Sequence, residues 1–345
     1  MKAEWTERQD DCREADYYRR EADGTLTCEL CPHACRLADG QRGRCRSRRN
    51  RGGRLWADSY GKVCALNIDP VEKKPLFHYY PGARCLSLAA TGCNLSCRNC
   101  QNWTISQAAP QEVDCAALGP DEVARLARAN RCPMVAYTYT EPLTYYEYTR
   151  DCAAACRAAG LKNVLVTAGY VNEAPLGELL ANVDAANVDL KSFSDEVYRS
   201  ISHATLKPVL RTLERMLEAD VWVEVTNLLI PGVNDDRAMI RAMCSWLVAH
   251  GFAEQPLHFS RFFPQYRMSD VPPTPVETLR AARDVARDCG MQYVYLGNVR
   301  LPGAEDTVCP DCGTVLVRRD GYRVAADGFT GICPRCGKTV AGHFG

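Results

Sequence analysis

The sequence lacks an excess of charge of either sign, since 42 lysines and arginines balance 42 aspartates and glutamates. Without a global electrostatic field, nothing in the overall charge favours nucleic acid or an anionic membrane as a partner. The sequence also lacks any apolar run that approaches the roughly 18 residues needed to span a bilayer. We therefore expect no membrane partner.

The first residues lack the apolar core of a secretory signal, because the run Met1-Lys-Ala-Glu-Trp-Thr-Glu-Arg-Gln-Asp-Asp11 is polar and charged. This predicts a cytoplasmic protein whose cysteines stay reduced. The chain has twenty cysteines, and more than half of them fall into spaced groups. In a reducing compartment such groups more often ligate metal than form disulfides.

The most informative group is Thr91-Gly-Cys-Asn-Leu-Ser-Cys-Arg-Asn-Cys100, in which Cys93, Cys97 and Cys100 follow an apolar run. Three thiolates can hold three irons of a 4Fe-4S cluster and leave one iron free to bind another molecule. A fourth cysteine is missing from this loop. A structural zinc site and three unrelated buried thiols are the alternative interpretations.

Apolar runs alternate with amphipathic segments over residues 84–302, which is typical of a parallel sheet covered by helices. Proline and acids after Gly119 and the run 234–236 predict helix starts, and Gly160 and Gly251 predict helix ends. Six strand-helix units fall short of the eight in a closed barrel, so the sequence predicts an α/β fold with a partial, open (β/α)6 barrel. The predicted strands are 85–90, 134–139, 163–167, 187–190, 221–230 and 257–262, with a further β-like stretch at 292–296 at one edge.

A second cysteine group lies near the N-terminus, where Cys28-Glu-Leu-Cys31-Pro-His-Ala-Cys35 is followed by Cys45. We expect this segment to be a loop rich in glycine and arginine that could not fold on a core of its own, so metal binding is the economical interpretation. Four thiolates suit either zinc or a complete iron-sulfur cluster, and the spacing does not decide between them.

Two copies of a Cys-x-x-Cys-Gly turn lie near the C-terminus, with their cysteines at Cys309, Cys312, Cys333 and Cys336. Two such turns complete a tetrahedral zinc site, so they predict a zinc ribbon. A tail of about forty residues needs a metal to fold. The chain is thus expected to have three parts: a cysteine-rich metal-binding region at 1–83, the partial barrel at 84–302 and a zinc-ribbon-like domain at 303–345.

The three-cysteine loop, placed after a first strand, resembles the radical S-adenosylmethionine (SAM) superfamily, in which the open iron binds SAM. The resemblance is closest to the activating-enzyme branch. The N-terminal pattern Cys-x-Leu-Cys-Pro-His-x-Cys and the stretch Asp69-Pro-Val-Glu-Lys-Lys-Pro-Leu-Phe-His78 further resemble the radical SAM enzymes of the AmmeMemoRadiSam system. This implies a 4Fe-4S cluster on Cys93, Cys97 and Cys100, and SAM as a cofactor.

Two other predicted strand ends carry the resemblance. The stretch Tyr137-Thr-Tyr-Thr-Glu-Pro142 is similar to the Gly-Gly-Glu-Pro element that binds the SAM amino group, and 189–191 matches the Asp-Leu-Lys that activases place near SAM. Capping of the following helix is the alternative role for the glutamate. The resemblance therefore implies cofactor-binding roles for Tyr139, Thr140, Glu141, Asp189 and Lys191.

The sequence departs from the activase pattern at several positions. Asn99 stands where an aromatic residue usually packs on adenine, which leaves Trp103 as a nearby candidate for stacking. Val166, Thr226 and Phe263 stand where an activase for pyruvate formate-lyase carries polar residues. These differences argue against a simple glycyl radical activase.

The resemblance implies an oxidoreductase that reductively cleaves SAM to a 5′-deoxyadenosyl radical, which abstracts hydrogen from an undetermined substrate. The alternatives are a glycyl radical enzyme activase like that of pyruvate formate-lyase, and a non-catalytic iron-sulfur and zinc scaffold that binds SAM or a partner. Expected partners are a small-molecule, peptide or protein substrate, an electron donor such as flavodoxin or ferredoxin, and the two other proteins of the AmmeMemoRadiSam system. Nucleic acid is not expected, because the arginine-rich run 36–54 lacks interleaved aromatics.

Overall fold

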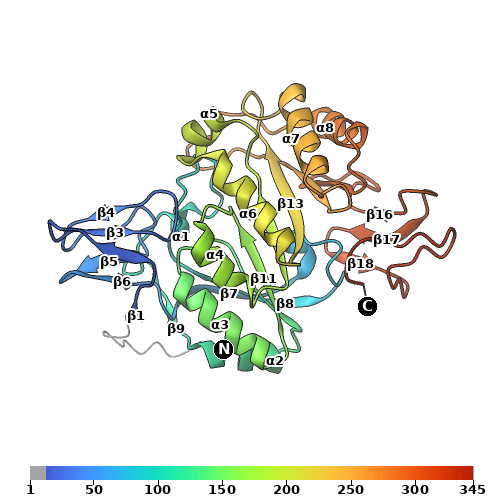
Figure 1. Ribbon diagram of the computed structural model, residues 1–345. Coiled ribbons are helices and arrows are strands. Elements are labelled where there is room, and N and C mark those ends of the chain that lie inside the picture. The colour runs from blue at the N-terminus through green and yellow to red at the C-terminus, as the bar shows by residue number, and fades with distance from the viewer. Residues whose placement is uncertain (1–12, 345) are drawn as a thin grey trace.

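The computed structural model describes residues 13–344 of the chain. The charged N-terminal stretch, on which the expectation about a secretory signal depends, lies outside the described residues. Figure 1 shows a central sheet with helices, small β-sheets of the N-terminal region on one side and the C-terminal strands on the other.

The central sheet has nine strands, and seven of them run parallel. Its edges do not pair with each other, so the barrel is open as predicted. All four residues of β10 are buried, as expected for a strand covered on both faces. The parallel strands are β8 (Arg84–Ala90), β10 (Met134–Tyr137), β11 (Lys162–Thr167), β12 (Ala185–Asp189), β13 (Trp222–Leu229), β14 (Leu257–Arg261) and β15 (Val294–Gly297).

Two further strands extend this sheet at the β8 edge. The strand β7 (Lys62–Pro70) pairs antiparallel with β8, and β9 (Ala116–Ala117) pairs antiparallel with β7. Sequence periodicity did not predict them, because β7 alternates little and its residues Leu66 and Ile68 are exposed. As a result β8, which leads into the three-cysteine loop, has neighbours on both sides.

The two helix starts and two helix ends that the sequence predicted are observed at α2, α3 and α7. Helix α2 starts with Pro120 at its first position, and α7 is capped by the Asp236 side chain, which accepts a hydrogen bond from the Met239 amide at 2.9 Å. No helix between residues 13 and 344 combines the length and the apolarity that crossing a membrane would require. The helices are α1 (Trp103–Ser106), α2 (Pro120–Ala129), α3 (Tyr146–Ala158), α4 (Glu173–Leu180), α5 (Asp195–Val197), α6 (Leu206–Glu218), α7 (Arg237–Ala249) and α8 (Val276–Asp288), with the short turns η1 (Val71–Lys73) and η2 (Tyr198–Ser202).

The N-terminal region forms two small antiparallel sheets rather than the expected loop. Its strands have only two to four residues each, too few to give a periodic signal. Leu26, Leu37 and Leu55 are buried in the same core as the barrel, so the region does not depend on a core of its own. The strands are β1 (Arg13–Glu14), β6 (Arg54–Ala57) and β5 (Arg48–Arg51) in one sheet, and β2 (Tyr18–Arg20), β3 (Leu26–Cys28) and β4 (Arg36–Leu37) in the other.

Several arginines of the basic run pair with carboxylates. Arg42 and Arg49 reach Asp58 at 2.7 and 3.0 Å, and Arg48 pairs with Glu147 in the interior. These side chains are held by carboxylates within the fold, with Arg42 and Arg49 sharing the single negative charge of Asp58.

The C-terminal strands β16 (Thr307–Val308), β17 (Val315–Asp320) and β18 (Arg323–Ala325) form a separate sheet that docks on the barrel. The buried Arg319 donates a hydrogen bond to the Phe77 carbonyl at 2.7 Å. His78 lies 2.7 Å from the Ala341 carbonyl and 2.6 Å from the Tyr295 hydroxyl. His78 therefore joins the C-terminal region to the barrel.

Candidate functional site

A cavity of about 470 Å³ opens at the carboxyl ends of the parallel strands, which is where such sheets bind ligands. Cys93, Cys97 and Cys100 all line it, and they are the cysteines among the described lining residues. The other strand ends also contribute, through Thr140, Glu141, Thr167, Asp189, Lys191, Leu228, Ser260 and Asn298.

Each sulfur of the three-cysteine loop has a polar neighbour. Cys97 Sγ lies 3.3 Å from the Ser202 hydroxyl, Cys100 Sγ lies 3.2 Å from the Ser106 hydroxyl, and Cys93 Sγ accepts from the Leu95 amide at 3.4 Å. Hydrogen bonds to ligand sulfurs tune the potential of an iron-sulfur cluster. The two serines come from η2 and α1, and no local sequence pattern indicates that they lie beside the sulfurs.

Burial raises the pKa of the Cys93 and Cys97 thiols above their ordinary value. Thiols in such surroundings stay protonated unless a metal ion or cluster replaces the proton. The donor set thus fits a bound iron-sulfur cluster: three thiols on one loop, a hydrogen-bonding group beside each sulfur, and no fourth cysteine on the described cavity wall.

Gly92 explains how the loop leaves β8. Its φ is +97°, and a Cβ atom at this position would lie 2.2 Å from Ser47 Oγ and 2.3 Å from the Cys45 carbonyl oxygen. Only glycine fits both the backbone conformation and this close approach. The loop is thereby packed directly against the N-terminal cysteine region.

The predicted SAM-binding element after β10 lines the cavity with Tyr139, Thr140 and Glu141. Tyr139 has a φ of +69°, a left-handed conformation that suits the glycine of the related motif and is rare for an aromatic residue. Its carbonyl accepts from the Asn102 side chain at 2.8 Å, and its hydroxyl donates to Asp69. These contacts hold the strained turn in place.

The Glu141 carboxylate is buried and points toward the end of β11. It accepts hydrogen bonds from the Thr167 hydroxyl at 2.6 Å, from the Ala168 amide at 2.8 Å and from the Leu143 amide at 3.2 Å. Burial raises the pKa of the Glu141 carboxyl, and these donors counteract that rise. The alternative role as a helix cap is not observed, because α3 begins only at Tyr146 and its preceding residue makes no side-chain cap.

Asp189 and Lys191 follow β12 and form an ion pair of 3.0 Å on the cavity wall. The Lys191 amide donates to the Tyr198 hydroxyl at 3.0 Å, so η2 fixes the position of this pair. Tyr198 also lines the cavity. It was not predicted as a site residue, because a tyrosine inside a helical segment resembles an ordinary core residue.

Two residues considered in the sequence analysis lie away from the cavity wall. Trp103 does not line the cavity and stacks on Tyr266 with ring centroids 5.0 Å apart. Phe263 is 43% exposed and also lies off the cavity wall. In contrast, Asn99, Val166 and Thr226 do line the cavity. An adenine-stacking role for Trp103 therefore has no geometric support.

Residues outside the predicted set of ligands and SAM-binding residues close the cavity from two other directions. Lys73 and Lys74 line it from the η1 side, and Tyr322 reaches it from the turn between β17 and β18. Lys74 is buried, pairs with Asp69 at 2.7 Å and lies 4.6 Å from the centre of the Tyr139 ring. These contacts depend on tertiary structure, and no local pattern in the sequence indicates them.

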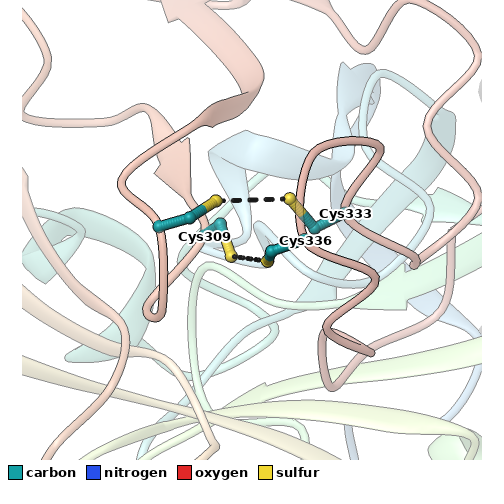
Figure 2. A group of neighbouring side chains, drawn as sticks. Cys309, Cys333 and Cys336 are labelled. Atoms are coloured by element: carbon teal, nitrogen blue, oxygen red, sulfur yellow. Dashed lines mark hydrogen bonds between the residues drawn. The ribbon is translucent and has the colours of Figure 1, made fainter.

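The C-terminal cysteines form a compact metal-binding group. The four ligand atoms of Cys309, Cys312, Cys333 and Cys336 all lie within 4.8 Å of one another. Figure 2 shows the labelled members of this group directed toward each other, with the paired sulfurs 3.5 and 3.6 Å apart. Tetrahedral zinc holds four thiolates at such separations. The group can therefore bind zinc or another metal, as the ribbon prediction requires.

The N-terminal cysteines Cys28, Cys31, Cys35 and Cys45 line a second, smaller cavity. His33, the other candidate ligand of this segment, lies with its Nε2 atom 2.8 Å from the Asn94 carbonyl oxygen. Asn94 belongs to the three-cysteine loop and lines this second cavity as well. The two cysteine groups thus have a common wall.

Comparison with known proteins identifies the family. Residues 88–243 match the model of the radical SAM superfamily. The chain is also 44% identical over 331 residues to the uncharacterized protein MJ0808 of Methanocaldococcus jannaschii, a match that covers 95% of this chain and 98% of that protein. The chain belongs to the radical SAM superfamily. It is accordingly an enzyme of the kind that uses a 4Fe-4S cluster and SAM.

Activating enzymes are among the relatives of this radical SAM protein. The chain is 24% identical over 185 residues to the benzylsuccinate synthase activating enzyme of Thauera aromatica, covering 50% of this chain and 56% of that enzyme. It is 23% identical over 167 residues to pyruvate formate-lyase 1-activating enzyme of Escherichia coli, a match that covers 45% of this chain and 68% of that enzyme. The solved structure of Streptococcus suis SuiB bound to S-adenosylmethionine shows 11% identity and a TM-score of 0.49, a match that covers 67% of this chain and 53% of SuiB.

Proposed function

We propose that this enzyme binds a 4Fe-4S cluster through Cys93, Cys97 and Cys100, and SAM at the iron that lacks a protein ligand. When bound, the cluster and SAM would supply a 5′-deoxyadenosyl radical by one-electron reduction, and this radical would abstract hydrogen from the substrate. The observation that carries the proposal is the convergence of the three sulfurs with both predicted SAM-binding elements on one cavity wall.

The spacing of the three sulfurs supports a cluster over the alternative of a zinc site. Among residues 13–344, they do not form a group whose ligand atoms all lie within 4.8 Å, whereas the C-terminal cysteines do. Zinc holds its sulfurs at about 2.3 Å from one central ion, which requires the closer arrangement. A cube of irons and sulfides keeps its ligands farther apart.

The chain's own residues would orient SAM and shield it from water. The Glu141 carboxylate, already held by two backbone amides and the Thr167 hydroxyl, would accept a proton of the SAM amine. The pair of Asp189 and Lys191, fixed by Tyr198, would contact the polar parts of SAM. The departures from the activase pattern at Val166 and Thr226 lie on the same wall, where they would shape the substrate space.

A glycyl radical enzyme activase is the second candidate function. The similarity to two activating enzymes favours it, and the replaced residues on the cavity wall argue against it. We further propose that the enzyme receives electrons from a flavodoxin or ferredoxin and acts with the two other proteins of the AmmeMemoRadiSam system. The N-terminal cysteine pattern supports that assignment. In this proposal residues 1–83, 84–302 and 303–345 act as metal-binding region, catalytic barrel and zinc ribbon.

The variant Cys97→Ala tests the main proposal. After anaerobic reconstitution with iron and sulfide, the variant should lose the SAM-induced change in the cluster's electron paramagnetic resonance (EPR) spectrum and release no 5′-deoxyadenosine with dithionite. The matched control is Cys115→Ala, which removes a partly buried thiol that lines neither cysteine-lined cavity and donates a hydrogen bond to the nearby Val113 carbonyl. Release of 5′-deoxyadenosine by Cys97→Ala at the control rate would refute the proposal.

A further inference from the structure

The four N-terminal cysteines converge on one cavity although they come from different segments. Cys28 ends β3, Cys31 and Cys35 lie in the connection to β4, and Cys45 lies before β5. All four line the same cavity. Three of them are buried and Cys35 is partly exposed, so the site has one side near solvent.

The arrangement of these sulfurs does not suit a single zinc ion. Within the described part of the chain, only the C-terminal group brings its ligand atoms within 4.8 Å of one another. A Cβ atom at Gly43 would lie 3.5 Å from Cys45 Sγ and 3.9 Å from Cys35 Sγ. The glycine therefore keeps side-chain atoms away from the space between these two sulfurs, as a larger metal centre would require.

The surroundings of the site place a hydrogen-bond donor beside one of its sulfurs. The Arg48 guanidinium is buried and lies 3.8 Å from Cys28 Sγ through Nη1, which also donates to the Asp16 carbonyl at 2.7 Å. The same guanidinium pairs with the buried Glu147 carboxylate, so Arg48 offers a ligand sulfur an N–H donor rather than a net positive charge. The four cysteines supply the thiols of the site, and His33 Nε2 beside them lies 2.8 Å from the Asn94 carbonyl oxygen.

The site is joined to the three-cysteine loop through backbone contacts. The Ser47 hydroxyl donates to the Thr91 carbonyl at 3.0 Å, and Gly92 packs against the Cys45 carbonyl. Asn94 lies between Cys93 and Cys97 in sequence and lines the N-terminal cavity. Gly92, which precedes Cys93 in the sequence, thus brings the two cysteine groups into contact through the Cys45 carbonyl.

We propose that the N-terminal cysteines bind a second 4Fe-4S cluster, and that this cluster passes electrons to the one held by Cys93, Cys97 and Cys100. A reduced donor protein of the flavodoxin or ferredoxin class loses one electron to the N-terminal cluster. That cluster is then oxidised again as the core cluster gains the electron. No bond or proton is exchanged in these steps, and the proposal rests on the proposed function of the core site.

Metal content tests whether the second cluster exists. After anaerobic reconstitution, the wild-type chain should hold about eight irons, two clusters of four. The variant Cys93→Ala/Cys97→Ala/Cys100→Ala should keep about four, with an EPR signal that SAM does not change. About four irons in the wild type, together with a zinc ion that is lost on removing the N-terminal cysteines, would overturn the proposal while leaving the core site intact.

The single variant Cys35→Ser tests the relay without removing the whole N-terminal group. With dithionite, which is small enough to reach both sites, the variant should release 5′-deoxyadenosine within about twofold of wild type. With reduced flavodoxin as donor, its core cluster should be reduced at least about tenfold more slowly. Equal rates with flavodoxin would overturn the relay.

Two controls separate the possible failures. Cys289→Ser changes a partly buried thiol that lines neither cavity, and it should match wild type in iron content and in both rates. Zinc bound by the C-terminal group should be unchanged in every variant, which reports that the chain has folded. If the wild type shows no SAM-dependent EPR signal, the proposed function is contradicted. If it shows that signal but holds only about four irons, only the second cluster and its relay are contradicted.

Discussion

Glu141 shows how a single side chain can join the structure of the barrel to its proposed chemistry. Its carboxylate accepts from the Thr167 hydroxyl and from the Ala168 and Leu143 amides while it lines the cavity. A carboxylate can accept in all of these directions, and a carboxamide cannot. Glutamate is therefore required for the fold of this turn as well as for any role toward SAM.

The substitution Glu141→Gln should lower the free energy of unfolding by about 2 kcal/mol, because its amide would face hydrogen-bond donors in a buried site. The affinity for SAM should fall as well. Urea unfolding and SAM titration of the reconstituted enzyme would measure the two effects. Glu277→Gln on the exposed side of α8 is the control, and equal stability of both variants would contradict this account.

A methyl group at Gly92 should disrupt the contact between the barrel and the N-terminal region. The variant Gly92→Ala would place Cβ 2.2 Å from Ser47 Oγ in a backbone conformation that disfavours alanine. We expect a loss of about 3 kcal/mol or more in unfolding free energy. In the matched control Gly177→Ala, in helix α4 with no atom within 4 Å of the added Cβ, stability should rise by up to about 1 kcal/mol. Thermal unfolding would compare them.

The docking of the C-terminal sheet depends on buried polar groups between elements. His78 contacts the Ala341 carbonyl and the Tyr295 hydroxyl, and its ring has no access to solvent. His258 is buried, does not line the cavity, and lies 2.7 Å from the Glu224 carboxylate. The same Glu224 carboxylate accepts from the Phe77 and His78 amides, so it orders the segment that receives the C-terminal sheet.

This docking should weaken in mild acid. Burial lowers the pKa of His78 from 6.5 to about 4, although the nearby Glu224 carboxylate acts in the opposite direction. Between these values the unfolded chain binds the proton and the folded chain does not, so stability falls as the pH falls. From pH 7 to pH 5 the loss should be about 2 kcal/mol.

Urea unfolding at the two pH values would measure this loss against the variant His78→Gln. The variant lacks the titrating ring, so its unfolding free energy should fall by about 2 kcal/mol less than that of the wild type between pH 7 and pH 5. His250→Gln, which removes a partly exposed histidine just after α7, should retain the wild-type dependence. An identical pH profile for all three proteins would exclude His78 as the cause.

At the scale of the whole molecule, the C-terminal region that carries the metal-binding cysteines also supplies one residue of the cavity wall. Tyr322, in the turn between β17 and β18, lines the cavity although the metal ligands lie elsewhere in the ribbon. Small domains of this size depend on their metal to stay folded.

Cys336→Ser should therefore lose the metal for which the four C-terminal cysteines are arranged, and proteolysis within residues 303–344 should increase. The cluster of the barrel should remain, because its ligands are held by β8 and η2. Zinc and iron analysis with limited proteolysis would check both results. The exposed Cys336 makes this substitution mild for packing, and retention of zinc would show that the group does not bind it.

The sequence predicted the parts of this molecule that depend on local pattern. The apolar runs became the parallel strands, and the three-cysteine loop lies at their carboxyl ends beside Glu141 and Lys191. It did not predict the hydroxyls beside the sulfurs, the position of Tyr322 or the two small N-terminal sheets. These features depend on contacts between distant segments or on strands too short to show a period.

The antiparallel partner β7 has a kinetic consequence for the loop that carries the three cysteines. Since β8 is hydrogen-bonded to β7 on one side and β10 on the other, its amides can open only when the sheet itself separates. In deuterated buffer the amides of residues 85–90 should exchange among the slowest in the chain, and those of the edge strand β15 much faster. The three-cysteine loop would then keep its position while other parts of the protein open locally and let molecules enter and leave.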